Sequence, residues 1–421
     1  MQEVDGRGRL VVRNIGQLLT MDSAAGELGK APAERILEII PDAAMVAEDG
    51  KVVWVGLEQD LSNEESPTTR ILDAGGRVVM PGLVECHSHL LFAGNRANEF
   101  ALRSMGATYE EIAAAGGGIV NTMTATRRAG ADALFTAGLA RLDDFLKLGV
   151  TTVESKSGYG LDPESEIKLL EVMRSLQTRH PVDVVPTFLG AHIVPPEHRQ
   201  ERRRYIDMLT REMIPEVARR NLARFCDVFC ENGAFTPDES REILESGAEY
   251  GLIPKVHAEQ LSHSGGALLA ARVGAASADH LDFATADDAR FMAMQGTVAV
   301  LLPGATFFLN KKRYPDGRLF TQAGCDVALS TDYNPGSSHT RNLWLMGTMG
   351  CTHCGLAPAV ALRAITRGAA RAIRMEHQVG RISRGLLADF LILDAMDWQE
   401  ILYLYGHNPV LQVYKRGRRV V

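Results

Sequence analysis

The sequence predicts an α/β protein: a (β/α)8 TIM-like barrel joined to a small β-sandwich domain that the N- and C-terminal segments form together. Three observations support this fold class. Short apolar segments of strand length recur eight times between residues 79 and 330, helical patterns fill the intervals, and short β segments gather at both chain ends. Strands that alternate with helices are typical of a parallel sheet, and eight such strands can close into a barrel. A doubly wound open sheet is the alternative.

The two chain ends are predicted to form the smaller domain. Short strands are expected there, with turns such as Asp49-Gly50 between them: Leu10–Asn14, Ala44–Val46, Val52–Val55, Arg77–Met80, Ala388–Leu393 and Val410–Lys415. Chain termini often lie close together, so strands from opposite ends can share one domain. The expected division is residues 1–78 plus 380–421 for the small domain and residues 79–379 for the barrel.

The barrel strands are predicted where an apolar run is short and bounded on both sides, because strands buried on both faces have this pattern. The eight runs are Val79–Val84, Gly149–Glu154, Val182–Phe188, Phe225–Cys230, Leu252–Val256, Ala275–Ala278, Gly296–Leu302 and Asp326–Ser330.

Helices are predicted between these runs, and capping residues mark where they begin. Asp162 precedes a proline, Thr236 opens a capping box, and Pro358 begins a further helical pattern. The first connection, Leu91 to Gly130, is long, and long loops in compact domains usually carry function. Its glycine cluster, 116–118, lacks the Lys-Ser/Thr of a phosphate-binding loop, so nucleotide binding is not expected.

The composition excludes several classes of function. The 421 residues carry 45 Lys and Arg against 52 Asp and Glu, a net charge of −7, which argues against partners such as nucleic acid or an anionic membrane. The longest apolar run, Val298–Leu309, is too short to span a bilayer, and the first ten residues lack the apolar stretch of a signal peptide. Six cysteines are too few for a disulfide framework, and Cys351 and Cys354 have no second such pair to complete a zinc site. A cytoplasmic protein is expected.

Four histidines and one aspartate stand where predicted barrel strands end. His87 and His89 follow the first run at positions i and i+2, so both side chains face the same side of an extended strand. His257, His280 and Asp332 follow the fifth, sixth and eighth runs. Because the carboxyl ends of barrel strands meet on one face, where such folds carry their active sites, these side chains are expected to surround one point.

This set of residue types predicts a hydrolytic metal site. His87, His89, His257 and Asp332 would hold one divalent metal ion, Zn2+ or Fe, because histidine and carboxylate ligands suit both metals. Such an ion activates water for attack on a carbonyl-type centre. Asp332 is the expected acceptor of the proton from that water, and His280 would orient the water or stabilise the developing oxyanion.

Longer motifs around these residues resemble the amidohydrolases and, among them, the imidazolonepropionases. The similar segments are PGLVECHSHLLFAGNRANEF, TTVESKSGYGL, TFLGAH, DVFCENGAF, KVHAEQL, SADHL, AVLLPGATFFL, STDYNPGSS and, near the end of the chain, GLLADFLILD. They cover nearly the whole chain. TDYNPGSS and SGYGL are more discriminating than the HxH pair, which is shared across the amidohydrolases.

The resemblance implies a substrate, a product and a set of site residues. Members of the family open the cyclic amide of 4-imidazolone-5-propanoate to N-formimidoyl-L-glutamate, the third step of histidine degradation, so a small anionic heterocycle is the expected substrate and a homodimer the expected assembly. His87, His89, His257 and Asp332 match the metal ligands, and His280 matches the catalytic histidine. Residues that match substrate contacts are Arg96, Tyr159, His192, Gln260, Asn334, Gly336 and Ser337.

Three of the matched positions carry further expectations. Arg96 suits the propanoate because a guanidinium is a bidentate donor to carboxylates. Gln260 is counted with the catalytic residues, but it stands where some members of the family have Glu, so hydrogen bonding is its expected role. The turn Asn334-Pro335-Gly336 is expected to leave backbone N–H groups free near the substrate.

Two other functions stand as alternatives. Another cyclic-amide hydrolase or aminohydrolase on the same scaffold would share the metal site and differ in the pocket. A non-enzymatic barrel is disfavoured, because such proteins typically lose metal ligands and all four are present here. Lys156 follows the second run, whereas the carboxylated lysine that bridges two metals in other amidohydrolases usually comes from a later strand, so one metal is favoured.

Overall fold

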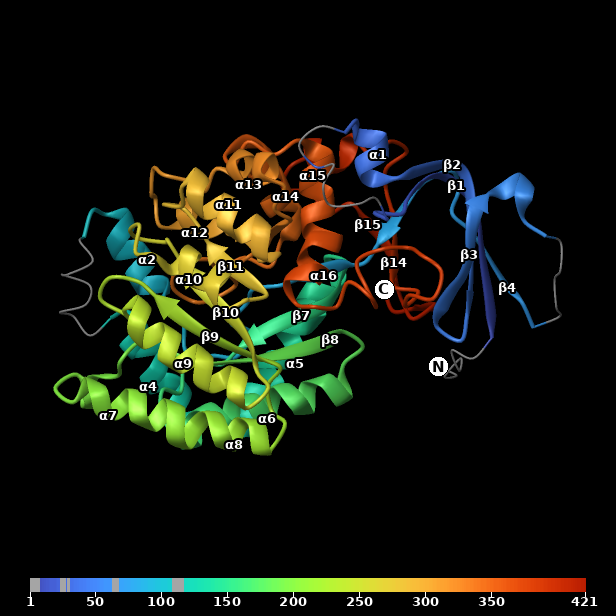
Figure 1. The fold of residues 1–421 in the computed structure, drawn as a ribbon. Helices are drawn as coiled ribbons and strands as arrows, with labels where there is room; N and C mark the ends of the chain where they lie inside the picture. The colour runs from blue at the N-terminus through green and yellow to red at the C-terminus, as the bar shows by residue number, and fades with distance from the viewer. Residues whose placement is uncertain (1–7, 23–27, 29–30, 63–67, 108–116) are drawn as a thin grey trace.

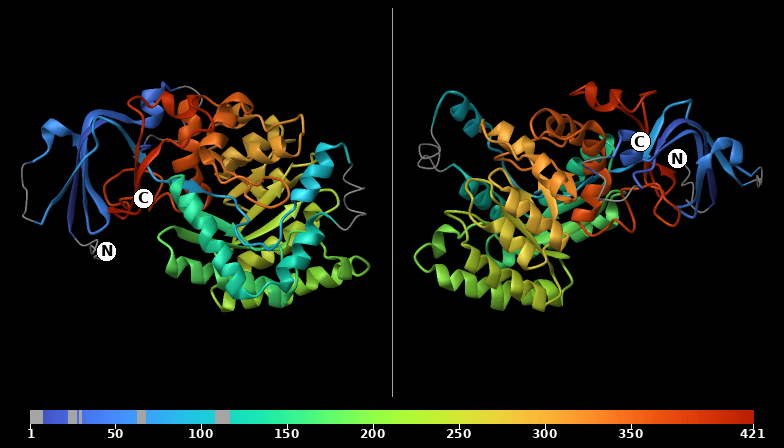
Figure 2. Two further views of the ribbon diagram at one scale, coloured as in Figure 1. Left: turned by 180° about the vertical axis from the view of Figure 1, so that it is seen from behind. Right: turned by 45° about the horizontal axis from the view of Figure 1, so that its top comes forward.

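The computed structural model describes residues 8–22, 28, 31–62, 68–107 and 117–421. A barrel surrounded by helices and a smaller sheet lie side by side (Figure 1), and views from behind and from a tilted angle show the same arrangement (Figure 2). The described part of the chain begins and ends beside the smaller sheet, at residues 8 and 421 (Figure 1). Gly116, in the predicted glycine cluster of the first connection, lies outside the described residues.

Strands from both chain ends form the smaller mixed sheet, which confirms the prediction that the two ends share one unit. The hydrogen-bonded order is β16-β15-β14-β5-β1-β2-β3, with β4 paired to β1. The bounds are β1 Arg9–Leu19, β2 Ile39–Glu48, β3 Lys51–Leu57, β4 Arg70–Asp73, β5 Val78–Pro81, β14 Phe390–Leu393, β15 Val410–Lys415 and β16 Arg418–Arg419. Antiparallel pairing of β5 with β14 sets Met80 opposite Leu391 and joins the two ends of the chain.

Eight parallel strands form the curved sheet of the barrel, in chain order from β6 to β13. Their bounds are β6 Leu83–Glu85, β7 Val150–Lys156, β8 Asp183–Ala191, β9 Phe225–Cys230, β10 Ile253–Ala258, β11 Ser277–His280, β12 Val298–Leu301 and β13 Val327–Leu329. The first and last strands meet just beyond their ends, where Ser88 forms a parallel bridge with Tyr333 and the His89 N–H donates to the Tyr333 carbonyl over 2.9 Å. The barrel fold predicted from the sequence is confirmed.

The predicted first run, Val79–Val84, belongs to two sheets. Its first part lies in β5 of the smaller sheet and its last part in β6 of the barrel, with Gly82 between them. A Cβ at Gly82 would lie 2.4 Å from Oγ1 of Thr151 on β7, so glycine lets the chain pass this strand closely. A continuous apolar run carries no mark of a change of sheet, which is why the pattern merges the two strands.

We propose the division expected from the sequence, residues 1–78 plus 380–421 and residues 79–379, as the two domains. A separate hydrophobic cluster inside the smaller sheet supports it. That cluster joins Val12 and Ile15 from the start of the chain with Phe390 and Tyr414 from its end.

Helices surround the barrel (Figures 1 and 2). The α-helices are α1 Ala33–Leu37, α2 Ala97–Ser104, α4 Ile119–Arg128, α5 Ala131–Lys147, α6 Pro163–Arg179, α7 Arg202–Met208, α8 Ile214–Arg219, α9 Pro237–Glu249, α10 Gly266–Arg272, α11 Ala286–Gln295, α12 Pro303–Phe308, α13 Gly317–Ala323, α14 Leu343–Thr352, α15 Pro358–Arg363, α16 Ala369–Ala372 and α17 Glu400–Tyr403. Short 3-10 turns span Glu58–Asp60 and Pro196–His198, and π-helical turns span Leu209–Met213 and Ala364–Gly368.

The predicted helix starts are present. The Asp162 side chain accepts the Ser165 N–H over 2.7 Å at the start of α6, and both hydrogen bonds of the capping box that begins at Thr236 are formed at the start of α9.

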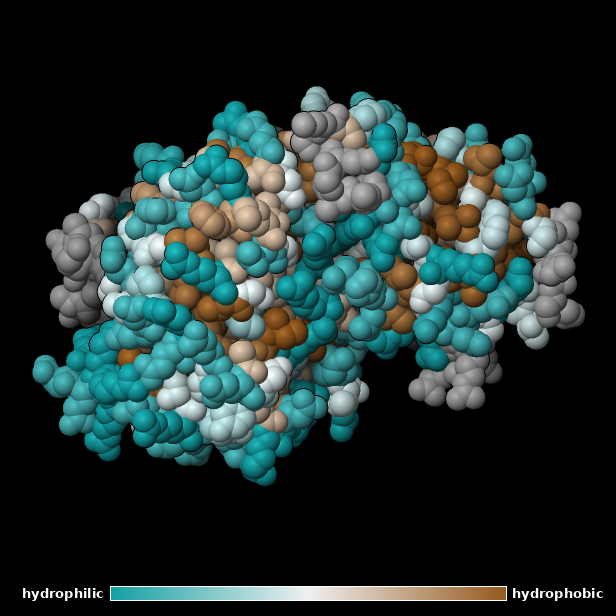
Figure 3. All heavy atoms as spheres, viewed as in Figure 1, coloured by the Kyte–Doolittle hydropathy of each residue, from teal (hydrophilic) through white to brown (hydrophobic). Residues whose placement is uncertain are grey.

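The surface around α7 and α8 is hydrophilic (Figure 3), and there Arg203 pairs with Glu242. Among the described residues, no helix has the length and apolar character needed to cross a membrane. All six cysteines are free thiols.

Candidate active site

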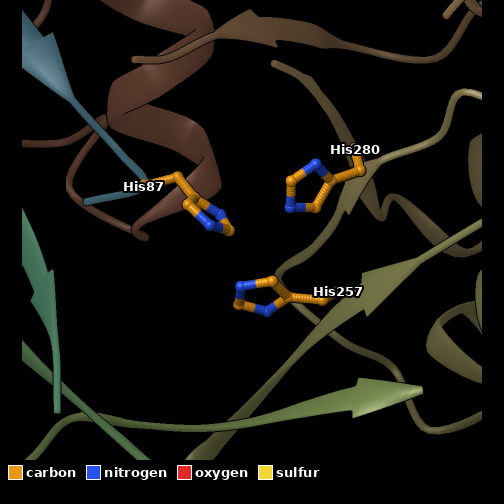
Figure 4. A group of neighbouring side chains, drawn as sticks. All are labelled: His87, His257 and His280. Carbon is orange, nitrogen blue, oxygen red and sulfur yellow. The ribbon is translucent and has the colours of Figure 1, made fainter. Parts of the chain in front are cut away.

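The carboxyl ends of the barrel strands bring five predicted side chains together. His87 and His89 follow β6, His257 lies near the end of β10, His280 ends β11, and Asp332 follows β13. All five are buried. Figure 4 shows the imidazoles of His87, His257 and His280 turned toward a common centre from separate segments, with ring centroids 4.5 to 5.5 Å apart.

Two of these residues have a backbone conformation that residues other than glycine rarely adopt. The φ angle is +80° at His280 and +52° at Asp332. Such conformations cost about 1–3 kcal/mol and persist where the surroundings hold them, often at active sites. At Asp332 the Ser337 hydroxyl donates to Oδ2 over 3.1 Å, and the Asn334 amide donates to the backbone carbonyl over 2.6 Å.

The histidine ring nitrogens are divided between carboxylate partners and an open side. His87 Nδ1 lies 2.6 Å from Asp279 Oδ2, and His257 Nδ1 lies 3.1 Å from Asp227 Oδ1. Because an ionised carboxylate only accepts hydrogen bonds, both Nδ1 atoms donate and both Nε2 atoms carry a lone pair. Each of these Nε2 atoms is buried without a hydrogen-bond partner among the described residues. Metal-binding histidines are typically held in this way.

Two overlapping groups of donor atoms could hold a metal ion. One contains His87, His89 and Asp332, and the other contains His87, His257 and His280; within each group the ligand atoms lie within 4.8 Å of one another. Asp332 Oδ1 is 3.6 Å from Nε2 of both His87 and His89. The donor atoms present therefore fit a metal ion, and His280 lies within the same range as the predicted ligands.

Burial determines the charge state of this centre. It is the main reason that the pKa values of His87, His89 and His280 lie well below the usual value, and neighbouring basic side chains lower them further. Burial also raises the pKa of Asp332 to about 7. The imidazoles of His87, His89 and His280 are therefore neutral, which is the form that binds metals.

A buried charge network lies behind the histidines. Lys156 Nζ contacts Glu154 Oε1 at 2.8 Å and Asp227 Oδ2 at 2.7 Å, and it lies 3.8 Å from Asp279 Oδ2. Burial lowers the pKa of Lys156, but the charges of Asp227, Glu154 and Asp279 outweigh it and raise that pKa above its usual value. Lys156 is therefore an ammonium ion that lies between the carboxylates that hold two of the histidines.

Asp227 and Asp279 are the residues that the sequence analysis missed. Both lie on barrel strands and are fully buried. For Asp227 the available signal was an acidic residue inside the otherwise apolar strand β9, because a charge in that position needs a partner. Asp279 also directly precedes His280.

A pocket of about 220 Å³ beside the histidines collects all the predicted substrate contacts. Its lining includes Arg96, Tyr159, His192, Gln260, Asn334, Gly336 and Ser337, together with His89, His257, His280 and Asp332. Apolar side chains such as Ile193 and Phe229 complete the wall. His89, His257, His280 and Asp332 thus line the same pocket as the predicted substrate contacts.

His192 and Tyr159 form an aromatic wall beside His89. The His192 ring stacks on the His89 ring with centroids 5.2 Å apart and an interplanar angle of 18°, and Tyr159 lies 5.5 Å from both rings. His192 Nδ1 donates to the Gly158 carbonyl over 2.9 Å. Burial lowers the pKa of His192 to about 4, so this side chain is a neutral contact.

The loop after β13 differs from the sequence expectation. Asn334 Oδ1 accepts the N–H groups of Gly336 over 2.7 Å and of Ser337 over 2.8 Å, so these backbone donors are not free. The expectation was wrong because an asparagine side chain readily bonds the backbone two residues further on. Asn334, Gly336 and Ser337 nevertheless line the pocket.

Glu259 and Gln260 are adjacent in the chain but have different surroundings. The Glu259 carboxylate accepts the N–H groups of Ser264, Gly265 and Ala267 at the start of α10. Gln260 lines the pocket. The Glu259 carboxylate therefore stabilises the start of α10, and the residue of the pair that lines the pocket is the amide Gln260.

Comparison with known proteins places the geometry in a family. The model of the Amidohydrolase family matches residues 229–420. Imidazolonepropionase from Geobacillus sp. (strain WCH70) is 48% identical over 416 residues, which cover 98% of both chains. Imidazolonepropionase from Brevibacillus brevis is 47% identical over 413 residues, which cover 97% of both chains.

Solved structures share the fold at low identity. A triazine hydrolase variant is similar with a TM-score of 0.74 and 18% identity, covering 98% of this chain and 94% of that one. Atrazine chlorohydrolase from Arthrobacter aurescens TC1, solved in complex with zinc, gives a TM-score of 0.71 at 16% identity, covering 98% of this chain and 95% of that one.

Proposed function

The chain belongs to the imidazolonepropionase family of amidohydrolases, and we propose that it hydrolyses the cyclic amide of 4-imidazolone-5-propanoate to N-formimidoyl-L-glutamate. One observation carries the proposal: the buried His257, with its unpartnered Nε2 atom, and the cationic Arg96 line one pocket. Hydrolysis of a small anionic ring needs both features within reach of one substrate.

His87, His89, His257 and Asp332 would hold one divalent ion, Zn2+ or Fe. Support comes from the carboxylates at His87 and His257, which fix each ring with its Nε2 lone pair free. When bound, such an ion acts as a Lewis acid and lowers the pKa of water toward neutrality.

Proton transfer falls to Asp332. Its Oδ2 accepts a hydrogen bond from Ser337, which keeps the carboxylate oriented in the pocket. This oxygen would accept the proton of the attacking water and deliver it to the ring nitrogen that leaves. His280 would hold the water or the developing oxyanion, and the Gln260 amide would hydrogen-bond the substrate.

The substrate is held by the outer part of the pocket. The Arg96 guanidinium would bind the propanoate, since it matches a carboxylate in charge and geometry. Tyr159 and the neutral His192 would contact the ring from the side of His89, and the loop of Asn334, Gly336 and Ser337 would contact substrate or product.

We also propose a cytoplasmic homodimer, the expectation from the family, and light scattering on the purified protein tests the assembly.

The test is ring opening by metal-replete protein. We expect turnover of 4-imidazolone-5-propanoate and far slower turnover of hydantoins, dihydroorotate and purines. Absence of turnover with 4-imidazolone-5-propanoate would contradict the proposal. Preferred turnover of another of these rings would favour the alternative, a different cyclic-amide hydrolase or aminohydrolase.

A further inference from the structure

Arg96 is attached to the protein through a buried glutamate on its own helix. Arg96 is the residue that precedes α2, and Glu99 lies three positions later in the first turn, with only 6% of its surface exposed. Arg96 Nε donates to Glu99 Oε2 over 2.6 Å. Among the described residues, neither terminal amino group of Arg96 has a hydrogen-bond partner, so these groups are free for a ligand.

The second oxygen of Glu99 is also used. Glu99 Oε1 accepts the backbone N–H of Gly118 over 3.0 Å. Gly118 precedes α4 with φ +82° and ψ −164°, a conformation that is essentially restricted to glycine. Glu99 thus joins α2 to the start of α4 and is held from both sides, which gives Gly118 a structural role.

The Arg96 guanidinium packs against the loop that follows β13. A Cβ built on Gly336 would lie 2.0 Å from Arg96 Nη1 and 2.8 Å from Cζ. The φ angle of Gly336 is not in the left-handed region, so its backbone alone does not require glycine. The missing side chain therefore makes room for Arg96, on the same loop that carries Asp332.

We propose that Glu99 is a positioning residue for substrate binding: it fixes Arg96 Nε so that the terminal amino groups face the substrate carboxylate, in the space that Gly336 leaves open. This inference rests on the proposed role of Arg96 in binding the propanoate. It adds a device that selects carboxylate-bearing rings, built from the starts of α2 and α4 and the distant loop that follows β13.

The first test is Glu99→Gln, which keeps the size of the side chain. The amide has one acceptor oxygen, so either Arg96 Nε–H or Gly118 N–H faces an NH2 group and loses its partner. We expect KM to rise by about ten-fold or more, since a hydrogen bond to a charged group is lost, while kcat and metal content change little. Glu216→Gln, which breaks the exposed Glu216–Arg219 pair on α8, is the matched control and should change nothing.

A double-mutant cycle separates positioning from a general structural effect. In an Arg96→Ala background, Glu99→Gln should no longer raise KM, because the residue through which it acts is gone. An equal rise in both backgrounds overturns the inference about Glu99 and leaves the proposed function standing. If Arg96→Ala itself leaves KM unchanged, the assignment of Arg96 fails, and the inference fails with it.

Gly336→Ala provides a second, independent cycle. In the native background the added methyl should displace the guanidinium and raise KM, whereas in the Arg96→Ala background it should have little effect.

Binding of imidazole-4-propanoate and of its neutral methyl ester gives a readout besides turnover. Glu99→Gln should weaken binding of the acid and spare the ester; equal weakening of both would overturn the proposal.

Discussion

The floor and the mouth of the pocket are built by different means. We define the floor as the five side chains gathered at the strand ends, together with the carboxylates and the lysine behind them, and the mouth as Arg96 with Glu99 and Gln260. The five gathered side chains are His87, His89, His257, His280 and Asp332. The floor side chains come from the barrel strands and their carboxyl ends and are buried at 0 to 3% exposure, and carboxylates fix His87 and His257. The mouth side chains come from a helix start and loops and are held by fewer hydrogen bonds.

The two regions divide the work of the site, with metal-ligand geometry set by the floor and substrate selection by the mouth. Strand register within a closed barrel sets the distances among metal-ligand atoms, and a change there disturbs several buried charges together. Loops and helix ends can change one contact at a time, which suits substrate selection. Substitutions in the floor should therefore have larger effects than those in the mouth.

The largest effect is expected for Asp332→Asn. It removes the acceptor of the water's proton, so kcat should fall on the order of 100- to 10,000-fold with a smaller change in KM. Steady-state kinetics with 4-imidazolone-5-propanoate is the measurement. A kcat within a few fold of the native value would remove Asp332 from the proton transfer.

Lys156→Met tests the charge network of the floor. It leaves Asp227 and Glu154 buried without their cation, and breaking a buried pair costs about 3–5 kcal/mol. Urea unfolding should show this loss in the free energy of unfolding, and competition with a chelator should show weaker metal binding.

Lys255→Met is the control: Lys255 is equally buried and lies 3.5 Å from Asp279, but its hydrogen bond goes to Ser277. It should destabilise the fold with less effect on metal binding, and equal effects on metal binding would count against a special place for Lys156.

Asp279→Asn tests one of the missed residues. The carboxylate holds His87 by its Nδ1–H, and loss of such a partner typically weakens metal binding by about 10–100-fold. The dissociation constant from chelator competition is the measurement. An unchanged constant would show that the orientation of His87 does not depend on Asp279.

The smallest effect is expected for Gln260→Ala in the mouth. The amide contributes a neutral hydrogen bond, and loss of one such bond corresponds to about 0.5–1.5 kcal/mol, or roughly two- to ten-fold in kcat/KM. Metal content should not change. A fall as large as that of Asp332→Asn would mean that Gln260 takes part in the chemistry, and the contrast between floor and mouth would then fail.

Sequence patterns predict the floor better than the mouth. His257 and His280 were found because a polar residue at the end of an apolar run stands out, and the barrel brings such ends together. The split of the first run at Gly82 could not be seen, since both sheets bury apolar residues on either side of it. The free backbone donors expected near Asn334 were wrong, because a side-chain acceptor competes for them.

The link between Glu99, Gly118 and Gly336 also could not be read from the pattern. It depends on how the first connection and the loop after β13 meet in space, and no periodicity records that contact. Asp227 was visible as a charge in an apolar strand and Asp279 as the neighbour of His280, but their partners, His257 and His87, appear only once the barrel brings them together.

The most direct test of this account is the metal content of protein purified without chelator, measured beside the His257→Ala variant. We predict about one equivalent of zinc or iron per chain in the native protein and a large loss in the variant, because the centre needs the Nε2 of that histidine. Native protein without metal, or a variant that keeps one full equivalent of metal, would contradict a metal site at the floor of this pocket.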